Sequence, residues 1–156
     1  MNLLPFFEWC ESTGLGLAVR ESVWLFPVIE AVHLLGLCLV GGALLLVDLR
    51  MIGAGLTRTS LPLLARQARP WLAAGVITMV LTGVLLFLSE SVKCYYSQAF
   101  WVKMTTLPVA LLFTFVVRQR VALSEHTSRQ TAALTGVASL ALWFTVAAAG
   151  RWIGFS

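Results

Sequence analysis

The sequence predicts an all-α, integral membrane four-helix bundle, and three observations lead to this fold class. Of the 156 residues, 59% are hydrophobic and 12% are charged, whereas about a quarter of the residues in soluble domains are charged. Four stretches are apolar over the roughly 20 residues that a helix needs to cross a bilayer. The basic residues gather mainly in the connections between these stretches. Residues 1–156 are therefore expected to form a single membrane domain.

The four expected spans cover about residues 22–47, 71–88, 100–117 and 132–155. Pro70 immediately precedes the second of them, where proline is tolerated at the first position of a helix. The first 20 residues combine aromatic Phe6, Phe7 and Trp9 with acidic Glu8. This mixture is typical of an interfacial segment that lies on the membrane and does not cross it.

The distribution of charge predicts the orientation of the chain. The first and third connections hold seven arginines and two acids, namely Arg50, Arg58, Arg66, Arg69, Arg118, Arg120 and Arg129 with Asp48 and Glu125. The positive-inside rule then places both termini and the loop of residues 89–99 outside. Asp48 and Arg50 are expected to pair at the inner surface, where such a pair contributes little. The expected partners are the lipid bilayer and other membrane proteins or copies of the chain, and no nucleic acid.

A few ionisable residues lie inside the predicted spans, where charged groups are costly and usually face the bundle interior. Glu30 and His33 belong to the first span, Lys103 to the start of the third and Arg151 to the end of the fourth. All four fall in the outer half of the predicted bundle. We therefore expect three helices to contribute to one site there.

The site suits haem b, which needs an imidazole ligand, an apolar slot and cations for its propionates. His33 is the predicted axial ligand. Lys103 is either a second ligand, if its amine is neutral, or a propionate partner, and Arg151 is a further propionate partner. Met104 and Met79 offer thioethers as alternative ligands. Glu30 is expected to orient His33 or to supply a proton.

Other interpretations of the same residues remain open at this point. Glu30 and His33 can form a structural pair in a non-catalytic subunit or assembly factor, or His33 can serve a proton relay or a quinone site. Lys103 and Arg151 also suit a role as interfacial anchors. Whether the protein is an enzyme is left open. Cys10 and Cys94 fall on the same side, where they are either a disulfide pair or two unrelated thiols.

Four segments carry a resemblance to known families: "WLFPVIEAVHLLGLCLVGGALLLVDLRMIG", "RPWLAAG", "TGVLLFLSESVKCYYSQAFWVKM" and "AAAGRWIGF". Over nearly its whole length the chain resembles an uncharacterised bacterial family of small membrane proteins, catalogued as a domain of unknown function. This resemblance implies a multi-pass protein of the bacterial inner membrane. It is more distantly similar to HemJ-type protoporphyrinogen oxidases and to CopD-like copper-resistance membrane domains. The HemJ likeness implies haem b held by His33 and Lys103. The CopD likeness implies a copper or small-solute transport element.

Overall fold

A computed structural model describes residues 3–155, and its architecture is a bundle of long helices. The long elements are α3 (Leu25–Ile52), α4 (Leu61–Ser89), α8 (Arg129–Ile153) and a continuous run formed by α6 (Gln98–Leu112), η1 (Phe113–Arg118) and α7 (Gln119–Leu123). All four are long and apolar enough to cross a membrane. The predicted four-helix membrane fold is confirmed, and the chain is a multi-pass membrane protein.

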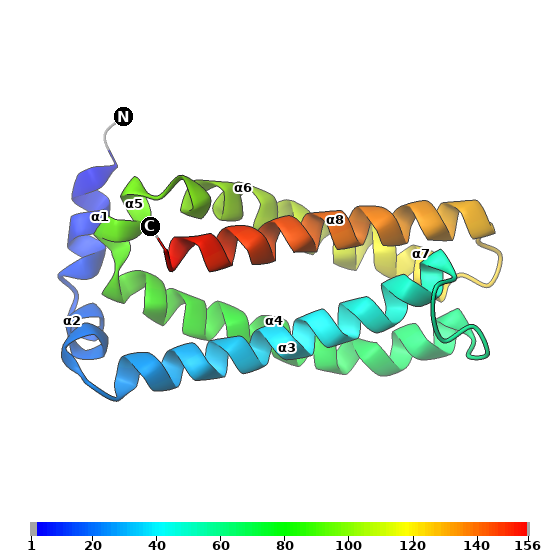
Figure 1. Cartoon of the computed structure of the whole chain (residues 1–156), viewed down its shortest axis with the longest axis horizontal. Helices are drawn as coiled ribbons and strands as arrows, with labels where there is room; N and C mark the ends of the chain where they lie inside the picture. The colour runs from blue at the N-terminus through cyan, green and yellow to red at the C-terminus, as the bar shows by residue number, and fades with distance from the viewer. Residues whose placement is uncertain (1–2, 156) are drawn as a thin grey trace.

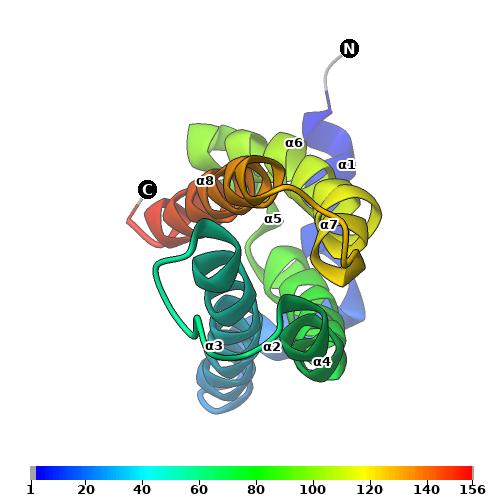
Figure 2. The same cartoon turned by 90° about the vertical axis from the view of Figure 1, so that its right-hand side faces the viewer.

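The long helices form two antiparallel pairs, with α3 packed on α4 and α6 packed on α8, and α3 also contacts α8 (Figures 1 and 2). Both ends of the chain lie at one end of the bundle, which we call the terminal end (Figure 1). The short helices α1 (Leu4–Glu11), α2 (Gly14–Glu21) and α5 (Ser91–Tyr96) also lie there. The helices α1 and α2 run across the bundle, as expected for a segment that does not span the bilayer.

The helix boundaries differ from the predicted ones because helices continue through the arginine-bearing segments. The prediction that Pro70 starts a helix is wrong, since α4 begins at Leu61 and Pro70 lies inside it. Ala65 and Ala68 are buried in the core while Arg66 is exposed, so the added turns are amphipathic. Burial of this alanine face extends the helix. Membrane helices tolerate the loss of the one backbone hydrogen bond that proline removes.

The main core fills the half of the bundle away from the termini. We call that end the arginine end, because it carries the seven arginines of the first and third predicted connections. Two glycines allow the helices to approach closely there. A Cβ on Gly75 of α4 would lie 3.0 Å from the backbone nitrogen of Val40, and one on Gly136 of α8 would lie 3.0 Å from the carbonyl oxygen of Asp48. The core itself consists of Val40, Ala43, Leu44, Val47, Met51, Ala65, Ala68, Leu72, Ala122 and Ala132.

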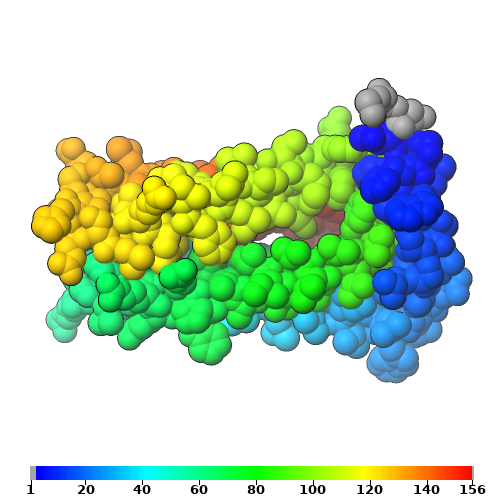
Figure 3. All heavy atoms as spheres, turned by 180° about the vertical axis from the view of Figure 1, so that it is seen from behind, coloured from blue at the N-terminus to red at the C-terminus, as the bar shows by residue number. Residues whose placement is uncertain are grey.

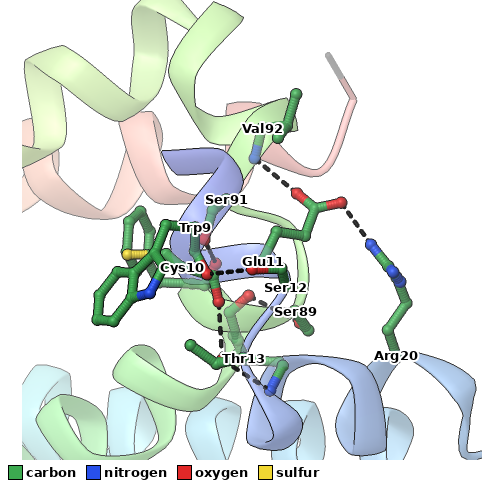
Figure 4. Close-up of polar contacts among 12 residues, drawn as sticks. Trp9, Cys10, Glu11, Ser12, Thr13, Arg20, Ser89, Ser91 and Val92 are labelled. Carbon is green, nitrogen blue, oxygen red and sulfur yellow. Dashed lines mark hydrogen bonds and ion pairs between the residues drawn. The ribbon is translucent and has the colours of Figure 1, made fainter. Parts of the chain in front are cut away.

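A hydrogen-bonded cap holds the short helices at the terminal end (Figure 4). One carboxylate oxygen of Glu11 accepts a hydrogen bond from the Val92 backbone N–H at 2.7 Å, and the other pairs with Arg20. The Thr13 side chain caps α2 by accepting from the Gly16 N–H at 3.2 Å. Gly16 also packs directly on the Leu88 carbonyl at the end of α4. These contacts join α1 and α2 to the junction of α4 and α5.

Replacing Gly16 with alanine is expected to loosen this cap. The new Cβ would lie 2.5 Å from the Leu88 carbonyl oxygen, so backbone must move, and such overpacking costs about 1–3 kcal/mol. Thermal unfolding of the purified protein measures the loss. Gly14→Ala is the matched control, because nothing lies within 4 Å of a Cβ at that position. Equal melting temperatures for the two variants would contradict the predicted packing.

Candidate functional site

The imidazole of His33 is oriented by a hydrogen-bond chain from α3 to α4. Its Nδ1 lies 2.8 Å from the Thr82 hydroxyl, which itself donates to the Thr78 carbonyl at 2.6 Å. A hydroxyl has only one proton to donate, so Nδ1 must be the donor in the first bond. In the neutral imidazole the ring proton therefore sits on Nδ1, and Nε2 keeps its lone pair. Within residues 3–155, Nε2 has no hydrogen-bond partner.

A glycine makes room for this ring on α4. A Cβ on Gly83 would lie 3.4 Å from His33 Cε1, so the half-buried imidazole packs directly on the helix at that position. Sequence reasoning missed the threonines and this glycine as site residues. The signal for them was two threonines four residues apart, at 78 and 82, followed by a glycine in an otherwise apolar span. Residues four apart share one face of a helix.

Lys103 approaches the same region from the other helix pair. Its Cδ, Cε and Nζ atoms lie 3.6–3.8 Å from where Gly150 of α8 would carry a Cβ. Lys103 lies in the second turn of α6 and His33 in the third turn of α3, both counted from the terminal end. In the described part of the chain, Lys103 makes no hydrogen bond and no ion pair. The fold thus brings an unpaired cation and an imidazole with a free nitrogen to one region.

The other predicted site residues, Glu30, Met104 and Arg151, are exposed at the surface of the bundle. The structural pair of Glu30 with His33 is not formed, since His33 bonds to Thr82 and Glu30 has no hydrogen bond or ion pair within residues 3–155. Arg151 is also exposed, and its guanidinium carbon lies 4.5 Å from the centroid of the Phe155 ring.

An opening in the side of the bundle leads toward this region. It lies between α4 and α6 near the terminal end, with the last turns of α8, coloured red, visible behind it (Figure 3). The helices that border the opening carry Thr82 and Lys103, and the helix behind it carries Gly150. Because α1, α2 and α5 cover the terminal end (Figure 1), the opening faces sideways, toward the lipid around a membrane bundle.

The arginine half contains a buried ion pair that sequence reasoning assigned differently. The expected pair of Asp48 with Arg50 is wrong, because Arg118 of η1 donates from Nε to Asp48. The same guanidinium donates to the Leu44 carbonyl at 3.2 Å, and Ser139 of α8 donates to the second Asp48 oxygen at 2.7 Å. Arg50 instead donates to the Thr59 carbonyl at 2.8 Å.

The length of the third membrane-spanning run, formed by α6, η1 and α7, explains this difference. Arg118 was placed in a connection, whereas the helix continues to Leu123 and carries Arg118 into the bundle, where 1% of it is exposed. A buried charge requires a counter-charge and hydrogen bonds. The turn that carries it is a π-helix, a form frequent at functional sites. The Thr114 hydroxyl in this turn accepts from Trp143 Nε1 at 2.9 Å, which ties the turn to α8.

The three cysteines are free thiols in the structure, so the disulfide between Cys10 and Cys94 is not formed there. Cys38 is exposed on α3, while Cys10 and Cys94 are buried at the terminal end. Burial, with the Glu90 carboxylate as a second cause, raises the pKa of the Cys94 thiol to about 11. Burial also raises the pKa of Cys10. Both thiols are therefore protonated at neutral pH.

Comparison with known families assigns the chain. A family model described as a family of unknown function, DUF6644, matches residues 6–156. The chain belongs to this family. No curated protein and no solved structure matches it. The prediction of an uncharacterised family is thereby confirmed, whereas the resemblance to HemJ-type and CopD-like proteins stays a prediction.

Removing the guanidinium of Arg118 is expected to destabilise the bundle strongly. Arg118→Leu leaves the buried Asp48 carboxylate without its counter-charge, which costs about 3–5 kcal/mol. Chemical denaturation in detergent micelles measures the loss, and Arg120→Leu, at an exposed arginine two positions along, is the control. Adding Asp48→Asn to Arg118→Leu should recover part of the stability. No recovery in the double variant would show that the pair contributes little.

The reaction of Cys94 with maleimide should depend on pH as its raised pKa requires. In a Cys10→Ser/Cys38→Ser variant, the rate should rise about tenfold per pH unit and level off only near pH 11, because the thiolate is the reacting form. In denaturant, the reaction rate of the same protein should level off near the pKa of a free thiol, about 8.5. A plateau near that lower pH in the folded protein would contradict the burial of Cys94.

Proposed function

We propose that this protein is a haem b-binding redox protein of the bacterial inner membrane, with its site in the terminal half of the bundle. The observation that carries the proposal is the hydrogen-bond chain from His33 through Thr82 to the Thr78 carbonyl. It leaves Nε2 of His33 unprotonated and without a partner in the described residues. An imidazole in this state is a metal ligand, and ligating histidines typically donate their other ring N–H to a nearby acceptor.

The donor set suits a haem better than a metal held by protein ligands alone. Residues 3–155 bring no group of three His, Cys, Asp or Glu side chains together. A porphyrin supplies four nitrogen ligands itself and needs only one or two axial ligands from the protein. His33 would hold the iron through Nε2.

Lys103 has two roles open to it in this site. Its ammonium is partly buried and unpaired among the described residues, so it would neutralise a propionate by a charge-assisted hydrogen bond. As a neutral amine it would instead help to hold the iron. Arg151 lies nearer the terminal surface and would bind a second propionate. Met104 and Glu30 are exposed and are not among the proposed haem contacts.

The chemistry of the site follows from these roles. A bound haem would supply one-electron oxidation and reduction. The side opening between α4 and α6 (Figure 3) favours exchange with a lipophilic partner dissolved in the bilayer. The arginine end faces the cytoplasm by the positive-inside rule, so the site lies in the outer half of the membrane.

The alternative functions have less support from the geometry. A non-catalytic subunit would use Glu30 and His33 as a structural pair, whereas His33 bonds to Thr82. A copper-transport element would need soft ligands along one path. Met51 is buried in the core of the arginine half, whereas Met104 and Cys38 are exposed.

Replacing His33 with alanine is expected to abolish haem binding. Protein purified after expression with a haem precursor should show a Soret absorption band, and His33→Ala should lose it. His126→Ala is the matched control, because His126 is exposed in the connection before α8 and should leave the band unchanged. A parent protein without the band, even after haem is added, would overturn the proposal.

A second variant separates ligation from structural damage. Thr82→Val keeps His33 but removes the acceptor that fixes its proton on Nδ1. We expect the Soret band to persist while haem affinity falls about 10–100-fold, as is usual when a ligand loses its hydrogen-bond partner. An unchanged affinity would show that the bond from His33 to Thr82 does not tune the site.

A further inference from the structure

An open groove of about 480 Å³ lies at the arginine end of the bundle. Figure 2 shows the helix ends that meet at this end: the last turns of α3 and α7 and the first turns of α4 and α8. The groove is lined by Arg50, Met51, Ser60, Leu61, Pro62, Ser124, Glu125, Thr127, Arg129 and Ala132. All four long helical elements or their connections thus contribute to one concave surface.

Two guanidinium groups line this groove without a carboxylate partner. The Nε atom of Arg50 donates to the Thr59 carbonyl at 2.8 Å, and this bond holds the side chain in place. The terminal nitrogen atoms of Arg50 have no partner within residues 3–155. The Arg129 side chain makes no hydrogen bond or ion pair there either, and one of its terminal nitrogens lies 3.7 Å from where Gly53 would carry a Cβ. Glu125 lines the groove but pairs with neither arginine.

The charge around the groove is strongly positive. Arg118 is neutralised by Asp48, which leaves six arginines and the single acid Glu125 at this end. The chain has two lysines, and both lie toward the terminal end, at Lys93 and Lys103. Lysine and arginine would serve equally well to fix the orientation of the chain in the membrane. A surface built only from arginine favours ligands that accept two parallel hydrogen bonds, as a phosphate group does.

The polar groups beside the arginines suit the same ligand. The hydroxyl of Ser60 lines the groove and does not cap α4, so it can donate. The first turn of α4 also begins at the groove, and the positive end of its dipole adds to the field of the guanidiniums. These features support the arginine pair, which is the main element of the site.

We propose that this groove binds a phosphate group through the guanidiniums of Arg50 and Arg129. The phosphate belongs either to a soluble ion or ester or to the headgroup of an anionic phospholipid. Both sources present the same charge and the same acceptor oxygens to the arginine pair.

The test uses the full-length protein in two arms. In detergent, the melting temperature is followed against inorganic phosphate, with chloride at equal ionic strength as the reference. In nanodiscs, phosphatidylglycerol is compared with phosphatidylcholine. Stabilisation by phosphate alone assigns a soluble ligand, and stabilisation by phosphatidylglycerol alone assigns a lipid. Either result supports the site only if it depends on Arg129.

Variants decide whether binding is local. Arg129→Gln should weaken binding at least about tenfold, and Arg129→Lys should fall in between because it keeps the charge but loses the bidentate geometry. Arg50→Gln should act like Arg129→Gln. Arg58→Gln is the matched control, because Arg58 is exposed at the same end and does not line the groove. The proposal is overturned if neither probe stabilises the protein, or if Arg58→Gln weakens binding as much as Arg129→Gln.

Discussion

The ion pair between Asp48 and Arg118 is the interaction on which the rest of the bundle depends. It joins α3 to η1, between α6 and α7, and the Ser139 hydroxyl brings α8 into the same network. All three side chains are buried between the helices, so these polar groups can be satisfied only by one another. Once they are paired, the helices are fixed at close range in the arginine half. The small residues Gly75 and Gly136 then allow that close range.

The terminal half follows the opposite principle. Its polar groups are only partly satisfied, since His33 uses one nitrogen and Lys103 has no partner in the described chain. The helix pairs are also less closely joined there, and the side opening between α4 and α6 results (Figure 3). One half of the bundle thus supplies rigidity and the other supplies groups available to a ligand. Catalytic and binding sites commonly violate local rules of stability in this way.

Sequence reasoning predicted the number and type of the spans, because their apolar composition is a strong signal. It also predicted that His33 and Lys103 would lie near the same end, since position along a helix fixes depth. It missed Thr82 and Gly83, because their roles depend on which face of α4 meets α3. The spacing of Thr78, Thr82 and Gly83 marks a polar face of α4, but only the packing of the two helices decides that this face meets His33.

The assignment of Arg118 failed for a different reason. An arginine after an apolar run usually marks the end of a span, but the helix here continues and a distant aspartate neutralises the charge. Asp48 and Arg118 are 70 residues apart in sequence, so composition within a window cannot pair them. The same limit explains why Pro70 was assigned to a helix start, although buried alanines before it extend α4.

The hydrogen bond between His33 and Thr82 also has a consequence for biogenesis. Both residues belong to the first helical hairpin, formed by α3 and α4, whereas Lys103 and Gly150 belong to the second. The N-terminal part of a chain is synthesised and folds first. The proton on His33 is therefore positioned within the hairpin that enters the membrane first. The second hairpin then adds Lys103 and, through Gly150 of α8, the opposite side of the site. Orientation of the imidazole precedes completion of the compartment around it.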